Sequence, residues 1–148
     1  MDKLPNKKYG VIYADPPWLF KTRSDKGKDK SPEKHYPVLS LADICAMDVS
    51  DIAKPDSVLL MWVCDPMLDQ AFKVIDAWGF KYKTVGFTWA KTNKNTMGFF
   101  TGLGYWTRGN PEMCLLATKG RPKRISKSVN QLIISQRQRH SEKPLIHK

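Results

Sequence analysis

Four consecutive residues, Asp15-Pro16-Pro17-Trp18, combine groups that could hold a planar base by its amino group. They follow the apolar run Tyr9–Ala14, which predicts a buried strand that ends at the two prolines, because proline has no N–H for a sheet ladder. Ligands of open α/β sheets bind at the carboxyl ends of strands. The Asp15 carboxylate and the Pro16 carbonyl could accept two amine hydrogens, and Trp18 could stack on the ring. For this segment taken alone, a surface turn in which Trp18 only packs is the alternative.

A second strand, a helix and a third strand are expected to support this segment. Residues 58–63 form a continuous apolar run and predict a central strand. Asp65 and Pro66 predict the start of a helix, with Asp65 as its N-cap, and Gly79 predicts its end. Residues 84–90 predict the next strand, which completes a βαβ unit. Further elements are expected at Ser40 as the cap of a short helix and at residues 112–118 and 131–135 as strands.

This order of elements predicts one α/β domain over residues 1–148, with a mixed sheet that is parallel at its centre. The net charge is +11, from 25 Lys and Arg against 14 Asp and Glu, which favours a polyanionic partner, with nucleic acid ahead of a membrane surface. Charge alone does not exclude a soluble basic protein without such a partner. No apolar stretch is long enough to span a bilayer and no secretory signal is present, so we expect a cytoplasmic protein.

Cysteine and histidine give no metal-binding pattern. The three cysteines, Cys45, Cys64 and Cys114, lack a C-x-x-C spacing, and the three histidines are scattered. We therefore expect no metal site and three buried, reduced thiols.

Read in chain order, a series of short motifs resembles the DPPW-type N6-adenine methyltransferases. This is the family of the subunit that methylates adenosine in eukaryotic mRNA, and the similarity is greatest to its bacterial and phage members that act on DNA. The motifs are Tyr13-Ala14-Asp15-Pro16-Pro17-Trp18, His35-Tyr36-Pro37, Leu60-Met61-Trp62-Val63, Ala77-Trp78-Gly79-Phe80-Lys81-Tyr82, Thr88-Trp89-Ala90-Lys91-Thr92-Asn93, Gly104-Tyr105-Trp106-Thr107-Arg108-Gly109-Asn110-Pro111-Glu112, Lys119-Gly120-Arg121-Pro122-Lys123-Arg124 and His140-Ser141-Glu142-Lys143-Pro144.

The resemblance implies a Rossmann-like methyltransferase sheet and transfer of a methyl group from S-adenosylmethionine to the N6 amine of adenine in DNA. An ionised Asp15 would act through positioning and electrostatics, with no metal and no covalent intermediate. The implied catalytic residues are Asp15, Pro16, Pro17 and Trp18, and the implied cofactor contacts are Asp15 and Lys143. The implied nucleic-acid contacts are His35, Tyr36, Trp89, Lys91, Asn93, Tyr105, Trp106, Arg108, Glu112, Arg121, Lys123 and Arg124.

Several of these residues have a structural alternative. His35 and Tyr36 could close over the base or could end a solvated loop. Trp89 could contact substrate or pack in the core, as we expect for Trp62. Glu112 could bind adenine or pair with Arg108. The basic turn with Arg121, Lys123 and Arg124 could bind phosphates or could only be solvated.

The family pattern continues beyond Lys143-Pro144 with segments that hold the ribose and adenine of the cofactor, and the present sequence has no counterpart of them. The sheet is therefore expected to be incomplete at the C-terminus, with a strand missing beside Tyr9–Ala14 and with weak cofactor binding. A homo- or hetero-oligomer could complete the fold. The alternative function is a catalytically silent or partner-dependent relative that binds nucleic acid, although the retained Asp15 favours an enzyme.

Overall fold

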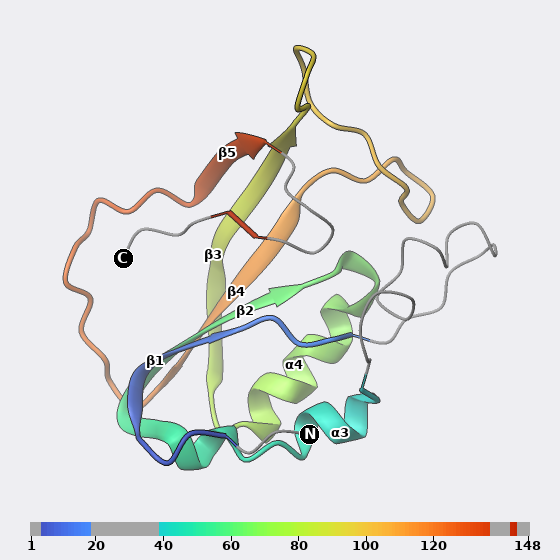
Figure 1. The fold of residues 1–148 in the computed structure, drawn as a ribbon. Coiled ribbons are helices and arrows are strands. Elements are labelled where there is room, and N and C mark those ends of the chain that lie inside the picture. The colour runs from blue at the N-terminus through green and yellow to red at the C-terminus, as the bar shows by residue number, and fades with distance from the viewer. Residues whose placement is uncertain (1–3, 19–38, 137–142, 145–148) are drawn as a thin grey trace.

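The computed structural model describes residues 4–18, 39–136 and 143–144 (Figure 1). In these residues, short helices separate the first three strands, and the last three strands follow one another without a helix. The elements are β1 (Tyr9–Ala14), α3 (Leu41–Cys45), the 3-10 helix η1 (Val49–Ile52), β2 (Ala53–Val63), the 3-10 helix η2 (Asp65–Met67), α4 (Leu68–Ala77), β3 (Lys81–Thr92), β4 (Glu112–Lys119) and β5 (Leu132–Gln136).

The strands form one mixed sheet in the order β1-β2-β4-β3-β5. The mixed α/β class is confirmed, but the expected parallel centre is wrong. Strands β2 and β3 run in the same direction, as a βαβ unit requires, yet they are not neighbours. Strand β4 returns along the gap between them and pairs antiparallel with both, so the parallel pairs, β1 with β2 and β3 with β5, lie at the two sides of the sheet.

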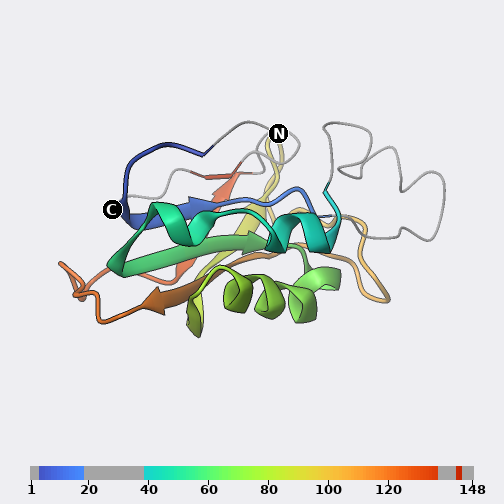
Figure 2. The same ribbon diagram turned by 90° about the horizontal axis from the view of Figure 1, so that it is seen from below.

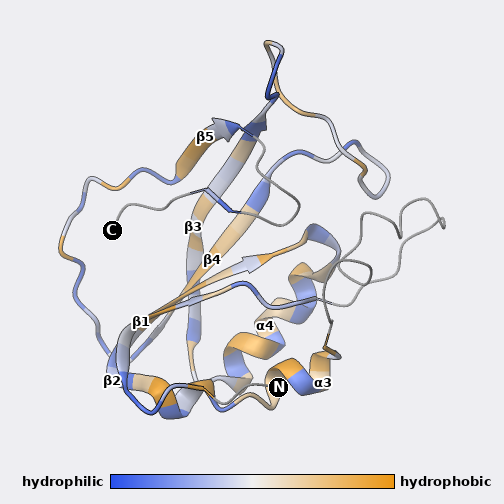
Figure 3. Cartoon of the chain, in the orientation of Figure 1, coloured by the Kyte–Doolittle hydropathy of each residue, from blue (hydrophilic) through white to orange (hydrophobic). Residues whose placement is uncertain are grey.

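One face of the sheet is covered by the helices, and this face holds the larger core. Figure 2 shows α4 lying along this face, and in Figure 3 its residues alternate between hydrophobic and hydrophilic. Leu59 and Met61 of β2 pack with Leu115 of β4 against the buried residues of α4. Helix α4 ends at Ala77, and Gly79 terminates it as predicted. The φ of +84° at Gly79 allows the paired hydrogen bonds of a Schellman motif, in which Gly79 N donates to Asp76 O and Phe80 N donates to Ile75 O.

The opposite face carries a smaller aromatic cluster. Trp62 and Trp89 meet edge to face, with ring centroids 6.4 Å apart. Phe87 joins them because the register of β3 with β4 shifts between Val85 and Phe87. In a regular strand these two residues would share a face, but here Val85 packs on the face of the larger core and Phe87 on the opposite face. Gly86 lies at this shift, where a Cβ atom would be 3.2 Å from Leu116 Cβ.

Two predicted helix starts have different outcomes. Ser40 caps α3 as expected, since its Oγ accepts a hydrogen bond from Asp43 N at 3.2 Å. The expected role of Asp65 is wrong: it begins the 3-10 turn η2, and α4 starts only at Leu68 without a side-chain cap. Proline at position 66 suits the tighter turn, where its missing N–H leaves no unpaired donor. Within the described ranges, no helix has the length and apolar character needed to cross a membrane.

Candidate active site

The Asp15–Trp18 segment forms a fixed turn at the carboxyl end of β1. The Pro16 carbonyl accepts a hydrogen bond from Trp18 N at 2.9 Å, and the Trp18 indole donates to the Trp62 carbonyl on β2 at 3.0 Å. Trp18 is only 4% exposed, so it presents no ring face to a ligand and the predicted stacking role is wrong. The indole is buried because its N–H finds a partner in the core, and it anchors the turn that carries Asp15.

Four charged side chains meet beside this turn. Lys143 Nζ lies 2.9 Å from Glu112 Oε1 and 3.6 Å from Asp15 Oδ2. Lys91 Nζ lies 3.1 Å from Glu112 Oε2. The two lysine side chains are largely buried, whereas the Asp15 side chain is 44% exposed. The structure therefore brings together four residues singled out in the sequence, in the order Asp15, Lys143, Glu112, Lys91, and leaves the Asp15 carboxylate accessible.

The two buried tryptophans lie beneath the lysines of this cluster. Lys143 Nζ is 5.5 Å from the centroid of the Trp62 ring, and Lys91 Nζ is 5.2 Å from that of Trp89. Such contacts with a cation stabilise the position of an ammonium group. Trp62 packs in the core as expected, and its indole donates to the Tyr13 hydroxyl at 2.7 Å. Trp89 is also buried, which agrees with the packing alternative and not with a contact to substrate. Its ring packs with Trp62 and Phe87 on one face of the sheet, and its indole donates to the Ser135 carbonyl at 3.4 Å.

Burial and charge move the pKa values of the two carboxylates in opposite directions. Burial raises the pKa of Asp15; the ammonium of Lys143 opposes this change, and the negative charge of Glu112 adds to it. Burial alone would raise the pKa of Glu112 as well, but Lys143 and Lys91 outweigh it, so the pKa of Glu112 is lowered. Glu112 is thus held ionised as a bridge between two cations, whereas Asp15 is the carboxylate with the stronger affinity for a proton.

A pH profile tests this arrangement. If the ionised form of Asp15 is needed for activity, the rate falls on the acid side at a higher pH than an ordinary aspartate would give, since its pKa is raised. Lys143→Met removes the cation that opposes this rise, so we expect the acid limb to move to still higher pH. The measurement is kcat/KM against pH for both proteins, because this ratio reports the ionisation of the free enzyme. An acid limb at the same pH in the variant would show that Lys143 does not set the charge state of Asp15.

Asn110 belongs to the site, although its residue type and neighbours predict no role for it. Its Oδ1 accepts from Lys91 N at 2.8 Å, and its Nδ2 donates to Lys91 O at 2.9 Å and also to Phe100 O. These bonds hold the end of β3 against the loop that follows it. Asn93 lies in the same loop and bonds through its backbone N–H to Gly98 O. An asparagine between a glycine and a proline predicts only a turn, so the sequence does not predict the hydrogen bonds that the Asn110 amide makes with Lys91 and Phe100.

Asn110→Ala is expected to destabilise the protein by about 2–3 kcal/mol, because three hydrogen bonds to backbone groups are lost. Asn110→Asp keeps the acceptor for Lys91 N but places a carboxylate oxygen against the carbonyl oxygens of Lys91 and Phe100, so it is expected to cost at least as much as alanine. Urea unfolding measures both values. Equal stability of all three proteins would mean that the amide does not hold the end of β3.

The loop after β3 carries four of the predicted nucleic-acid contacts, Asn93, Tyr105, Trp106 and Arg108. Gly102 and Gly109 exchange backbone hydrogen bonds of 2.7 and 3.1 Å, which close a small hairpin. Arg108 donates to the carbonyls of Gly102 and Thr101, so the alternative pairing of Glu112 with Arg108 is wrong. Trp106 lies between these glycines with φ of +74° and 86% of its surface exposed. Tyr105, next to it, is also exposed.

The basic turn after β4 lies far from Asp15. Strand β4 begins at Glu112, beside the charged cluster, and ends at Lys119, seven residues along an extended strand. At the usual rise this separates the two ends of the strand by about 24 Å. Arg121, Lys123 and Arg124 follow Lys119, so the structure does not bring them together with the other predicted contacts. His35 and Tyr36 lie outside the described residues.

An acid and two thiols are among the other ionisable groups near this edge. Asp65 follows β2, and burial together with the nearby Glu112 raises its pKa, which makes it a third carboxylate near the cluster that the sequence suggested only as a helix cap. All three cysteines are free thiols; Cys114 is buried, whereas Cys45 and Cys64 are partly exposed, contrary to expectation. Burial raises the pKa of Cys64 and Cys114 to about 12, so both stay protonated. Among the described residues, no three His, Cys, Asp or Glu side chains form a group suited to a metal.

The mixed sheet and the Asp15 turn at the carboxyl end of its first strand define an α/β methyltransferase-like domain. The MT-A70 family profile matches residues 9–147, and the chain belongs to this family of N6-adenine methyltransferases. It is 36% identical over 159 residues to the type II methyltransferase M.MunI of Mycoplasma sp., an alignment that covers 96% of the chain and 65% of that protein.

Eukaryotic relatives are more distant. The chain is 26% identical over 138 residues to an N(6)-adenosine-methyltransferase MT-A70-like protein of Arabidopsis thaliana, covering 92% of the chain and 18% of that protein. It is 25% identical over 139 residues to the human N(6)-adenosine-methyltransferase catalytic subunit METTL3, covering 93% of the chain and 22% of that protein. The chain thus spans somewhat under two thirds of its bacterial relative and about a fifth of the eukaryotic ones.

Proposed function

We propose that this protein transfers a methyl group from S-adenosylmethionine to the N6 amine of adenine in DNA. The observation that carries the proposal is the accessible carboxylate of Asp15, fixed at a strand end and flanked by the Lys143–Glu112–Lys91 chain of ion pairs. Membership of the MT-A70 family supports the N6 amine of adenine as the group that receives the methyl group. The higher identity to a bacterial methyltransferase than to the eukaryotic N(6)-adenosine methyltransferases supports DNA over RNA.

The reaction requires hydrogen-bond acceptors for the two hydrogens of the adenine amine. The lone pair of an adenine amine is delocalised into the ring, which makes the nitrogen a weak nucleophile. An ionised Asp15 would accept one amine hydrogen, and the Pro16 carbonyl, which uses one lone pair for Trp18 N, would accept the other with its second. Both bonds draw the nitrogen toward tetrahedral geometry and concentrate its lone pair, and they are set in place before the reaction begins.

The charged groups present fit the cofactor. S-adenosylmethionine supplies an electrophilic methyl group on a positively charged sulfur and carries an amino-acid end with both charges. The Asp15 carboxylate would complement a positive charge, and the Lys143 ammonium, 3.6 Å from it, would complement a carboxylate. Glu112 holds Lys143 in place through its 2.9 Å contact, so the alternation of signs is fixed by the fold.

The hairpin after β3 is the part of the site best suited to nucleic acid. Trp106 offers an exposed ring on a backbone braced by Arg108, and exposed aromatic rings stack on bases without sequence preference. Tyr105 and Asn93 belong to the same loop, and Lys91 and Glu112 line its base.

Nucleoside analysis tests the proposal. The purified protein is incubated with S-adenosylmethionine and genomic DNA from a strain without adenine methylation, which offers every short target sequence. Digestion and mass spectrometry should reveal N6-methyladenine. The same assay on RNA transcripts separates the two nucleic acids. Methylcytosine alone, or methylation of RNA alone, would overturn the assignment of adenine in DNA.

A further inference from the structure

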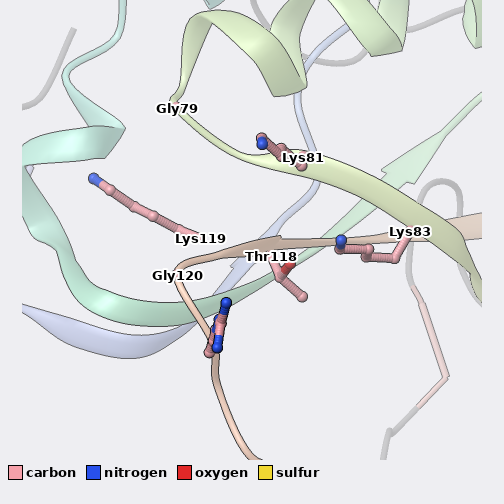
Figure 4. A pocket seen from close by; sticks show the side chains of 7 residues that line it. Gly79, Lys81, Lys83, Thr118, Lys119 and Gly120 are labelled. Atoms are coloured by element: carbon pink, nitrogen blue, oxygen red, sulfur yellow. The ribbon is translucent and has the colours of Figure 1, made fainter.

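A surface rich in cations lies where β4 ends and β2 and β3 begin, at the opposite end of these strands from Asp15. A shallow hollow of about 370 Å³ there is lined by Lys81 and Lys83 of β3 and by Lys119 and Arg121 at the end of β4. Figure 4 shows Lys81 and Lys83 on β3 beside the end of β4, which carries Lys119 and the turn at Gly120. The register explains the grouping, because Lys81 pairs with the residue before Lys119.

A second hollow, of about 430 Å³, extends this surface. It shares Arg121 with the first and adds Lys54 of β2 and Lys123. We call these six cations, Lys54, Lys81, Lys83, Lys119, Arg121 and Lys123, the far-edge basic surface. Among the residues that line the two hollows, Asp56 is the one acid, and its Oδ1 already accepts a hydrogen bond from Arg121 N at 2.8 Å.

The backbone that carries these cations is held in one conformation. Gly120 has φ of +67°, and a Cβ atom there would overlap Asp56 Oδ1 and the Pro55 carbonyl oxygen. Lys119 Nζ donates to Ser50 Oγ at 2.8 Å, which fixes that side chain. The other cations of the far-edge basic surface remain exposed. A rigid turn with several solvent-facing cations binds an anion without the entropy cost of ordering a loop.

The lining favours phosphates over a protein surface. Protein interfaces are depleted of lysine and enriched in aromatic residues. The linings of the two hollows contain four lysines besides Lys119 and the guanidinium of Arg121, but no aromatic side chain. Regularly spaced phosphates suit such a surface, since each one neutralised by Lys or Arg releases condensed counterions.

We infer that the far-edge basic surface binds backbone phosphates of the DNA duplex that flanks the target adenine. This inference rests on the proposed function, because the ligand is the same nucleic acid. The length of β4 separates the surface from the charged cluster by about 24 Å, which is the rise of about seven base pairs. Phosphate contacts position the duplex and carry no sequence information, so they add affinity for long duplexes of any sequence.

The test compares two double variants of equal charge. Lys81→Gln with Lys83→Gln removes two cations of the far-edge basic surface, and Lys73→Gln with Lys127→Gln removes two exposed lysines outside it. Binding is measured by fluorescence anisotropy with a 30-base-pair duplex over a range of salt concentrations. The first variant should lower the slope of log affinity against log salt by about 2. The control variant should keep a slope close to that of the wild-type protein.

An unchanged slope for K81Q/K83Q would overturn the inference, as would an equal loss of slope in both variants. Thermal melting of the two variants confirms that each is folded. The assay needs no methyl transfer, so it can fail while adenine methylation is observed, and it can succeed in a protein that shows no turnover. The binding assay can therefore reject phosphate binding by the far-edge basic surface without rejecting adenine methylation.

Discussion

Replacing Asp15 by alanine is expected to lower the rate of methyl transfer to DNA by about a thousandfold, because a preorganised acceptor for the amine is lost. The affinity for a long duplex is expected to stay within about twofold of wild type, since the exposed hairpin and the far-edge basic surface are untouched. The measurements are single-turnover methylation and fluorescence anisotropy on the same duplex. A variant that still methylates at about a tenth of the wild-type rate would remove Asp15 from the mechanism.

Asp15→Asn is the matched control for this prediction. The amide keeps the size of the side chain but replaces one acceptor oxygen by a donor, so activity should be lost nearly as fully as with alanine. Its stability at neutral pH should not fall. The raised pKa means that folding disfavours the ionised form of Asp15, so the carboxylate costs folded-state stability as the pH rises through that pKa. A marked drop in melting temperature for D15N would instead indicate a structural role.

Local sequence patterns predicted the five strands but not their arrangement. The apolar runs of β1, β2 and β4 and the helix stop at Gly79 are patterns of neighbouring residues, and the structure has these elements. The expected burial of β1 is wrong, because β1 lies at one edge of the sheet and its residues Tyr9, Val11 and Tyr13 are exposed. The position of β4 between β2 and β3 depends on pairing across a loop of 19 residues, which no local pattern encodes. The start of β2 at Ala53 was missed for a similar reason, since its first residues include Pro55 and are ordered by pairing with the neighbouring strands.

The candidate site shows the same division. Asp15 and Lys143 were expected near one another because of the family resemblance, whereas the bridge through Glu112 follows from the register in which Trp89 pairs with Glu112. The sequence allowed Trp18 and Trp89 either to contact a base or to pack in the core, and both are buried. A tryptophan beside a functional motif has the same local pattern whether it binds a ligand or supports the residue that does, and only tertiary packing separates the two cases.

Glu112 is expected to be the most sensitive residue of the site after Asp15. Its carboxylate is the shared partner of Lys91 and Lys143, which are both largely buried. Glu112→Ala leaves two ammonium groups without it, and breaking such a buried arrangement costs about 3 kcal/mol. Lys143 would remain beside Asp15 and Lys91 would lose its position at the end of β3, so methyl transfer should fall by about a hundredfold as well.

A double-mutant cycle separates the ionic effect from the loss of packing. Glu112→Ala leaves the Lys91 ammonium without its carboxylate partner. If this causes the loss of stability, then Lys91→Met should lower the free energy of unfolding much less in the Glu112→Ala background than in wild type. The expected coupling energy in urea unfolding is about 1–2 kcal/mol. The pH dependence provides a second check. The lowered pKa of Glu112 means that its contribution to stability is present at neutral pH and is lost as the pH falls below about 4.5 and through the folded-state value. The stability gap between wild type and Glu112→Gln should therefore narrow in acid. Additive effects in the cycle together with a gap that does not change with pH would show that Glu112 contributes through packing, and the chain of ion pairs would then lose its place in the mechanism.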